Sequence, residues 1–254
     1  MLAPLRVPEP WASRFPPWAL TLPANVDAVA DGEPGNRRQG VAAQLADGVS
    51  MSEWRAAWAA HLGLTALADA VLGEILAALE ARGTADQTLT IFCSDHGENL
   101  GQHGMYQKME MYEPAWRVPL LVRWPGGRPG RCEMPVSHLD LLPTILDWAD
   151  LPTPAGLPGR SLRSVVRDGE PLLERPVFGL YAGNAGRGDQ RRAVVTQRWK
   201  YIWDPATTPE LYDLVADPLE MHNLAADAQH AATLAELHAQ LRAWASSQGD
   251  WLTP

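Results

Sequence analysis

The sequence has little of what would place it outside the ordinary globular proteins. Its 254 residues include two cysteines, Cys93 and Cys132, too few for a disulfide framework and not paired at metal-ligand spacing. No uninterrupted apolar run reaches the ~18 to 20 residues of a membrane-spanning helix, so no membrane partner is expected. Basic residues form no long run and the net charge is −9, so no nucleic-acid partner is expected either.

The first residues also lack the charged segment and apolar run of a secretory signal, which makes the cytoplasm the default expectation for localisation. Hydrophobic residues make up 46% and charged residues 20%, as in globular proteins, and the length is sufficient for a hydrophobic core. The abundant residues are 22 prolines and 21 glycines. So many chain-breaking residues predict many loops around a compact core.

The distribution of proline and of apolar residues divides the chain into three expected parts. Residues 1–49 hold seven prolines, which remove backbone donors too often for regular structure, so this part is expected to be a proline-rich extended arm. Residues 50–171 are expected to form an α/β unit. Residues 172–254 are expected to form a small α+β subdomain.

A long helix is predicted at the start of the second part. Ser50 and Glu53 have the spacing of a capping box, and apolar residues then recur at three- and four-residue steps over 52–82. Gly83 is placed to end the helix. The pattern predicts one long helix, or two that join near Gly63.

Short β-prone segments follow. Segments 88–93 and 118–124 are almost wholly apolar, a composition typical of strands buried in a parallel sheet. A helix is predicted over 137–149. The C-terminal part is expected to contain a small antiparallel sheet and a closing helix, from segments 176–181, 192–196, 199–203, 211–214 and 225–247.

Polar residues come directly after segment 88–93, in the order Ser94, Asp95, His96, Gly97. In α/β sheets, side chains just beyond the carboxyl end of a strand face the ligand crevice. Asp95 offers a hard oxygen ligand and His96 an imidazole, and both could bind a divalent cation. The alternative, that both residues only cap the following segment, stays open because two ligands do not make a site.

Two further polar residues follow in the next loop. Lys108 carries a compact charge that can neutralise a sulfate or phosphate oxyanion, although a lysine in a loop is often simply solvated. His103 could donate a proton near neutral pH or could serve as a hydrogen-bonding spacer. Neither alternative is decided by these residues alone.

Several motifs occur in order over nearly the whole chain. They comprise 94–97, 100–104, Lys108, Tyr112-Glu113, 117–120, 137–146, Lys200-Tyr201, 210–214, Asp217-Pro218 and Asn223-Leu224. In this order the motifs closely resemble the sulfatase family of the alkaline-phosphatase-like superfamily. The resemblance implies a partial α/β sulfatase fold in which 50–171 is the C-terminal part of the catalytic domain and 172–254 a subdomain with an antiparallel sheet and a packed helix.

The resemblance also implies roles for individual residues. Asp95 and His96 match two ligands of the family's divalent cation, with calcium expected first and manganese second. Lys108 matches the catalytic lysine that contacts the sulfate group. The substrate implied is a small-molecule or saccharide sulfate ester, and the reaction is hydrolysis of that ester.

The family's nucleophile has no counterpart in the sequence. Sulfatases use a formylglycine made from cysteine in a Cys-x-(Pro/Ala)-x-Arg motif, and neither Cys93 nor Cys132 lies in such a motif. Both cysteines are therefore expected to be packing residues. The resemblance implies a truncated hydrolase whose full-length parent carries the formylglycine, and its expected protein partner is the missing N-terminal portion or a second copy.

Two alternatives remain. The same residues suit a phosphoryl group, so a phosphodiesterase or phosphonate monoester hydrolase of the same superfamily is one. The other is a non-catalytic chain that binds a partner through the predicted helix 52–82, with Trp54 and Trp58 in the contact.

Overall fold

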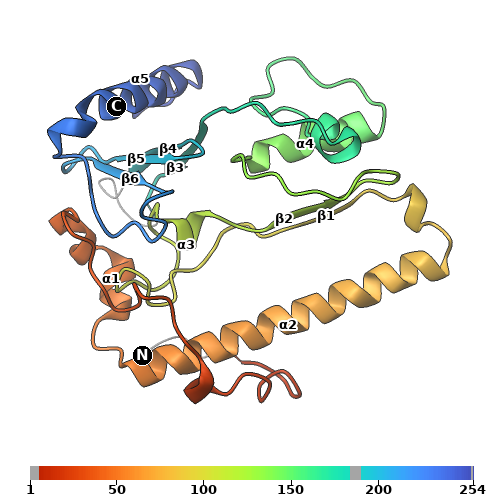
Figure 1. The fold of residues 1–254 in the computed structure, drawn as a ribbon, viewed down its shortest axis with the longest axis horizontal. Helices are drawn as coiled ribbons and strands as arrows, with labels where there is room; N and C mark the ends of the chain where they lie inside the picture. The colour runs from red at the N-terminus through yellow and green to blue at the C-terminus, as the bar shows by residue number, and fades with distance from the viewer. Residues whose placement is uncertain (1–5, 184–189, 253) are drawn as a thin grey trace.

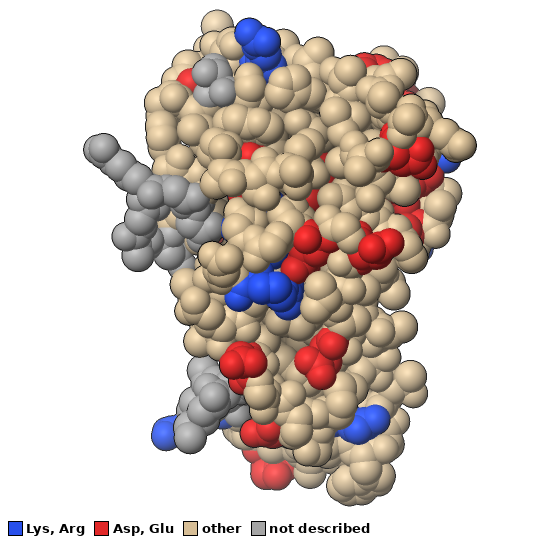
Figure 2. Space-filling model, turned by 90° about the vertical axis from the view of Figure 1, so that its left-hand side faces the viewer, with Lys and Arg blue, Asp and Glu red and all other residues tan. Residues whose placement is uncertain are grey.

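The computed structural model describes residues 6–183, 190–252 and 254 (Figure 1). In the view of Figure 1, a two-stranded sheet lies between a long helix, α2, and a short helix, α4. A four-stranded sheet with helix α5 lies to the left of the two-stranded sheet and α4 in that view. On the face in Figure 2, most of the surface is uncharged and acidic and basic side chains are interspersed. The described chain also contains short helical segments of three to five residues: η1 Pro17–Ala19, η2 Gly35–Gln39, η3 Ala85–Gln87, η4 His138–Asp140, η5 Ser164–Asp168 and η6 Ala228–His230.

Helix α2, Met51–Ala81, confirms the predicted long helix and is a single helix. The Ser50 hydroxyl accepts the Glu53 amide at 3.3 Å and the Glu53 carboxylate accepts the Ser50 amide at 2.9 Å, so the capping box is formed. Gly63 does not interrupt the helix. A Cβ there would lie 2.8 Å from the carbonyl oxygen of Trp11, so glycine allows the first segment to pass close to the helix.

Strands β1 (Thr90–Cys93) and β2 (Leu120–Arg123) form where strands were predicted, but they pair antiparallel with each other. The expectation of buried parallel strands is wrong for the described chain, because no residue of either strand is buried. Cys93 and Cys132 are both exposed, so the expectation that they pack in the interior is also wrong. An apolar sequence predicts a strand, but it does not specify the strand's partner or its cover.

The C-terminal sheet has all four predicted strands, in the antiparallel order β3-β4-β5-β6. Their bounds are β3 Val177–Tyr181, β4 Arg191–Val195, β5 Trp199–Trp203 and β6 Glu210–Asp213. Helix α5, Ala231–Ser247, begins six residues later than predicted and packs Leu237 and Leu241 against the sheet. The small sheet with a packed helix is therefore as predicted.

The described part of the first segment is tied to the rest of the molecule. It contains helix α1, Val41–Ala46, which the density of prolines did not predict. The buried guanidinium of Arg37 lies 2.7 Å from a carboxylate oxygen of Asp204 and 2.5 Å from one of Glu210. The segment is thus anchored to the C-terminal sheet by buried ion pairs, while residues 1–5 lie outside the described residues.

Two short helices follow the two-stranded sheet. Helix α3, Glu113–Trp116, was not predicted, and α4, Leu141–Trp148, lies within the predicted segment and has Pro143 in its first turn. On α2, Trp54 is fully buried and Trp58 donates to the Leu100 carbonyl at 2.8 Å. These tryptophans belong to the protein's own core. Among the described residues, α2 is the one helix with the length and apolar composition that crossing a membrane would require.

Candidate active site

The loop that follows β1 carries Asp95 and His96 on the surface. The Asp95 carboxylate accepts the backbone N–H of His96 at 2.9 Å, and this hydrogen bond holds the pKa of Asp95 below its ordinary value. Ser94 donates its hydroxyl to the His96 carbonyl at 2.8 Å. The Asp95 side chain is 83% exposed and that of His96 40% exposed, so both are open to a ligand.

The imidazole of His96 is oriented by its own backbone. Its Nδ1 lies 2.8 Å from the Gly97 carbonyl oxygen, and because a carbonyl only accepts, we assign the proton to Nδ1. The Nε2 lone pair is then free, and Nε2 lies 3.4 Å from Oδ2 of Asp95. A carboxylate oxygen and an unprotonated imidazole nitrogen this close fit two positions of one divalent cation.

This donor set is small. Among the described residues, no group of three or more His, Cys, Asp or Glu side chains is placed to hold a metal ion. Calcium takes 6 to 8 oxygen ligands, so Asp95 and His96 account for only part of a coordination shell. The residues present therefore fit a cation as two of its ligands.

The Glu98 carboxylate connects the two ends of the loop that precedes Lys108. Its Oε1 accepts the backbone amide of Gln107, and the Leu100 amide at 3.4 Å. Asn99 adds a 2.6 Å hydrogen bond from its side chain to the Gln107 carbonyl. Burial raises the pKa of Glu98, and the hydrogen bonds from the Leu100 and Gln107 amides, with the charge of Lys108, act in the opposite direction. The ammonium of Lys108 is therefore within electrostatic range of the Glu98 carboxylate.

Lys108 itself is exposed and makes no ion pair among the described residues. It is one of only two lysines in the chain, and the other, Lys200, is fully buried. An exposed ammonium that makes no ion pair in the described part of the chain is available to contact an anion. Sequence reasoning expected Asp95 and His96 as two ligands of one cation and Lys108 as the sulfate-binding lysine, and both roles stay predictions.

Helix α3 packs against this loop and accepts hydrogen bonds from its backbone. The amides of Gly97 and Glu98 each donate at 2.8 Å, to the carbonyls of Ala115 and Pro114. A Cβ at position 97 would lie 2.0 Å from the Pro114 oxygen, so only glycine permits this contact. Gly97 is thus required for close approach to α3, whereas the sequence motif alone indicated freedom to bend around an ion.

The loop is also held by η4, the short helical segment that directly precedes α4. The His138 ring places Nε2 2.8 Å from the carbonyl oxygen of Ser94. Sequence reasoning included His138 in a family motif without giving it a role. Its contact fixes the last residue before Asp95, so the loop is held from two elements.

His103 lies in the core and not at this surface. Its ring is buried and stacks on Tyr112 with centroids 4.0 Å apart. Burial, with the positive charges of Lys200 and Arg38, lowers the pKa of His103 to about 3. A neutral, buried imidazole is not available as a proton donor near neutral pH, which favours the structural role for His103.

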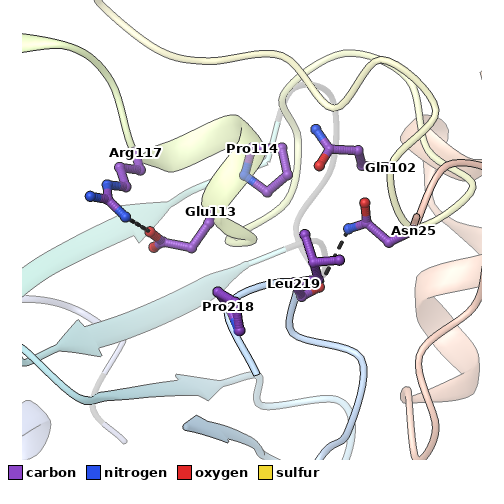
Figure 3. Close-up of a pocket in the computed structure, with 7 residues that line it drawn as sticks. All are labelled: Asn25, Gln102, Glu113, Pro114, Arg117, Pro218 and Leu219. Carbon is purple, nitrogen blue, oxygen red and sulfur yellow. Dashed lines mark hydrogen bonds and ion pairs between the residues drawn. The ribbon is translucent and has the colours of Figure 1, made fainter. Parts of the chain in front are cut away.

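A small cavity of about 200 Å³ lies elsewhere, between α3 and residues of the first and last segments (Figure 3). Figure 3 shows Glu113 paired with Arg117, and Asn25 donating to the Leu219 carbonyl, at 3.8 and 3.4 Å. None of Asp95, His96 and Lys108 lines it. We therefore place the candidate active site on the open loop surface and not in this cavity.

Comparison with known proteins identifies the family. The family model described as Sulfatase matches residues 16–151, and the model N-sulphoglucosamine sulphohydrolase, C-terminal, matches residues 101–247. Each match covers more than half of the chain. The chain belongs to the sulfatase family. Its fold is the α/β alkaline-phosphatase-like fold, as the motif order predicted.

Curated sulfatase relatives are longer than this chain. A choline-sulfatase of Rhizobium meliloti is 38% identical over 160 residues, which are 62% of this chain and 31% of the relative. The multifunctional alkaline phosphatase superfamily protein PehA of Trinickia caryophylli is 31% identical over 269 aligned residues, covering 98% of this chain and 51% of the relative. The chain thus spans about a third to a half of the length of these relatives.

The chain also spans only about half of the length of similar proteins with solved structures. The phosphonate monoester hydrolase SpPMH of Silicibacter pomeroyi has a TM-score of 0.78 and 27% identity, covering 94% of this chain and 53% of that one. A protein solved in complex with its substrate D-glucosamine-2-N,6-O-disulfate has a TM-score of 0.70 and 27% identity, covering 79% of this chain and 43% of that one.

Proposed function

We propose that this sulfatase-family chain supplies one side of the active site of a metal-dependent sulfuric ester hydrolase. The observation that carries the proposal is the convergence of the Asp95 carboxylate and the His96 Nε2, 3.4 Å apart, in the family's loop after β1. We further propose the division expected from the sequence, with 50–171 as the C-terminal part of the catalytic domain and 172–254 as a subdomain that supports it.

Each site residue has a proposed role. Asp95 and His96 hold a divalent cation, calcium before manganese as the resemblance to the family implies, and the carboxylate of Asp95 suits either ion. The cation, when bound, stabilises negative charge on the oxygens of the ester. Lys108 binds the same group as a point charge and neutralises the charge that develops during displacement. Glu98 and Gly97 position these three residues.

The nucleophile is proposed to come from outside the residues of this chain, as a formylglycine. Within the chain, Cys93 and Cys132 lie in no Cys-x-(Pro/Ala)-x-Arg motif. The substrate class proposed is a small-molecule or saccharide sulfate ester. Support comes from the choline-sulfatase relative and from the neighbour solved with a glucosamine disulfate as its substrate.

A second candidate is a phosphonate monoester hydrolase. The similarity to SpPMH over 94% of the chain favours it, and a cation with a lysine suits a phosphonate as well as a sulfate. Steady-state kinetics on p-nitrophenyl sulfate and p-nitrophenyl phenylphosphonate, with calcium or manganese present, decide between them. They require the chain assembled with the remainder of a sulfatase fold. A higher kcat/KM on the sulfate supports the proposal, and a higher kcat/KM on the phosphonate contradicts it.

A further inference from the structure

The cavity of about 200 Å³ beside α3 takes no part in the proposed reaction, and both of its ends are polar. Figure 3 shows the side-chain amides of Asn25 and Gln102 at one end, which we call the amide end. Glu113 and Arg117 form the other, the charged end. Pockets for drug-sized ligands measure about 300 to 1,000 Å³, so this smaller cavity suits a molecule of one ring.

The amide end is held in place by the backbone. Val26 pairs antiparallel with Gln102, and the His103 amide donates to the Asn25 carbonyl at 2.9 Å. Asn25 is 1% exposed, and its Nδ2 donates to the Leu219 carbonyl at 3.4 Å. Its Oδ1 is buried without a hydrogen-bond partner among the described residues. A buried acceptor that lacks a donor is costly, which favours a ligand that brings an O–H or N–H group.

The charged end carries one group of each sign. Oε1 of Glu113 lies 2.7 Å from the Lys200 ammonium, and Oε2 lies 3.8 Å from the Arg117 guanidinium. A separation of 3.8 Å is too long for a hydrogen bond, so Oε2 can still accept and the guanidinium, 72% exposed, can still donate. An anion at Arg117 would face the Glu113 carboxylate, and a cation at Glu113 would face two positive groups. The charged end therefore favours a neutral ligand that both donates and accepts.

The walls between the two ends are apolar. In the view of Figure 3, Pro114 lies on one side of the cavity and Pro218 and Leu219 lie on the other. Apolar walls with a few fixed polar groups are typical of small-molecule sites. The walls suit the C–H groups of a ring, and the polar ends suit hydroxyl groups, because a hydroxyl both donates and accepts.

We propose that this cavity binds one neutral sugar ring, such as an uncharged unit of a saccharide. Its hydroxyl groups donate to Oδ1 of Asn25 and to Oε2 of Glu113. They accept from the guanidinium of Arg117 and the amide of Gln102, while the C–H groups of the ring pack on the apolar walls.

The sugar site is separate from the candidate active site but contacts the same helix. None of Asp95, His96 and Lys108 lines the cavity. Pro114 belongs to both surroundings, because its carbonyl accepts the Glu98 amide at 2.8 Å and it also lines the cavity. The ligand class follows from the lining residues and from no step of the reaction. Binding of sugar and turnover of a sulfate ester can therefore fail independently.

The test titrates the full chain with D-glucose. Saturation-transfer difference NMR detects binding, and the methyl spectrum of leucine-labelled protein locates it. We expect a dissociation constant of about 1 mM and a shift of the Leu219 methyl signals. Cyclohexanol has a ring of the same size with a single hydroxyl, and glucuronate and glucosamine add a charge of either sign. Each of the three is expected to bind about 10-fold more weakly than glucose or worse.

Two variants remove the amide end. Gln102→Leu and Asn25→Leu delete the polar groups at similar side-chain size, and each is expected to weaken glucose binding by about 10-fold or more. Gln229→Leu makes the same change at an exposed position of η6 outside the cavity and is the matched control. Thermal melting followed by circular dichroism checks folding. If Asn25→Leu does not fold, the partly exposed Gln102 still provides the decisive variant.

Four results would overturn the proposal. If glucose at about 100 mM leaves the Leu219 signals unchanged, the cavity holds water alone. Tighter binding of glucuronate or glucosamine than of glucose would make the ligand an ion of that sign. Equal binding of cyclohexanol and glucose would show that only apolar surface is recognised. Equal binding of glucose by the parent and Gln102→Leu would place the sugar elsewhere on the protein.

Discussion

The Nζ atom of buried Lys200 lies 2.7 Å from Oε1 of Glu113, the first residue of α3. The same ammonium lies 2.7 Å from Oε1 of Glu220, and Glu220 accepts the backbone amide of Glu113 at 2.6 Å. Since α3 holds Gly97 and Glu98 through its carbonyls, this contact connects the C-terminal sheet to the loop of Asp95 and His96.

Removing the charge of Lys200 should strongly destabilise the protein. Burial alone would lower the pKa of Lys200, but Glu220 and Glu113 raise it above its ordinary value, so the lysine is charged. Lys200→Met leaves the buried carboxylate of Glu220 without its positive partner and removes the nearer of two positive partners from half-buried Glu113. We expect a loss of about 3 to 5 kcal/mol in the free energy of unfolding. Urea unfolding followed by fluorescence measures it. Adding Glu220→Gln to Lys200→Met should restore part of the loss, and a strictly additive further loss would contradict the pairing.

Arg37 should stabilise the folded protein in a similar way, by holding the first segment on the C-terminal sheet. Its guanidinium is buried between Asp204 and Glu210, and these carboxylates with Glu110 hold the pKa of Arg37 above its ordinary value despite burial. Arg37→Met is expected to lower the free energy of unfolding by about 3 to 5 kcal/mol. Arg131→Met is the matched control, since the Arg131–Glu133 pair is exposed and such pairs contribute about 0 to 1 kcal/mol. Equal effects of the two variants would show that the segment is not anchored by Arg37.

The protein should lose stability in mild acid through His103. The pKa of this buried imidazole is lowered from 6.5 to about 3, so the unfolded state binds a proton between these values and the folded state does not. The contribution of His103 is therefore complete above pH 6.5 and falls as the pH drops. By pH 5 the loss is about 2 kcal/mol.

The variant His103→Asn isolates this contribution, because asparagine tolerates the backbone φ of +57° at position 103. Thermal or urea unfolding of both proteins at pH 5 and pH 7 gives the comparison. We expect the parent to lose about 2 kcal/mol more than the variant between these pH values. Identical pH dependence in the two proteins would mean that His103 is not held neutral in the folded state.

Glu98 should control the order of the loop between His96 and Lys108. In Glu98→Ala the amides of Leu100 and Gln107 lose their side-chain acceptor. A lost hydrogen bond of 1 to 3 kcal/mol should raise amide exchange in residues 98–108 by about 10-fold or more. Hydrogen exchange with mass spectrometry measures it, and Glu133→Ala on the exposed surface should leave the same peptides unchanged. Protection retained in Glu98→Ala would assign the loop's order to other contacts.

Local patterns in the sequence predicted much of the fold. The capping box of Ser50 and Glu53 and the spacing of apolar residues located α2, and short β-prone segments located the strands of both sheets. The neighbouring positions of Asp95 and His96 likewise follow from adjacency in the chain. Such features depend on residues a few positions apart, so the sequence contains them directly.

Other features depend on residues far apart in the chain and could not be predicted. Arg37 and Glu210 are separated by 173 positions, and no local pattern indicates that they meet. The glycine requirement at position 97 comes from the carbonyl of Pro114 across the loop. The exposure of Cys93 has a similar origin, because a strand's sequence shows its fitness for burial but not what covers it.

The central claim is that Asp95, His96 and Lys108 form one side of a sulfate ester hydrolase site. Its most direct test is kcat/KM for p-nitrophenyl sulfate in the assembled enzyme, measured with calcium for the parent, Lys108→Ala, Asp95→Ala and the exposed control Arg131→Ala. The account predicts losses of about 10² to 10³ in Lys108→Ala, a comparable or larger loss in Asp95→Ala, and no change in the control. Undiminished turnover in both site variants would contradict it.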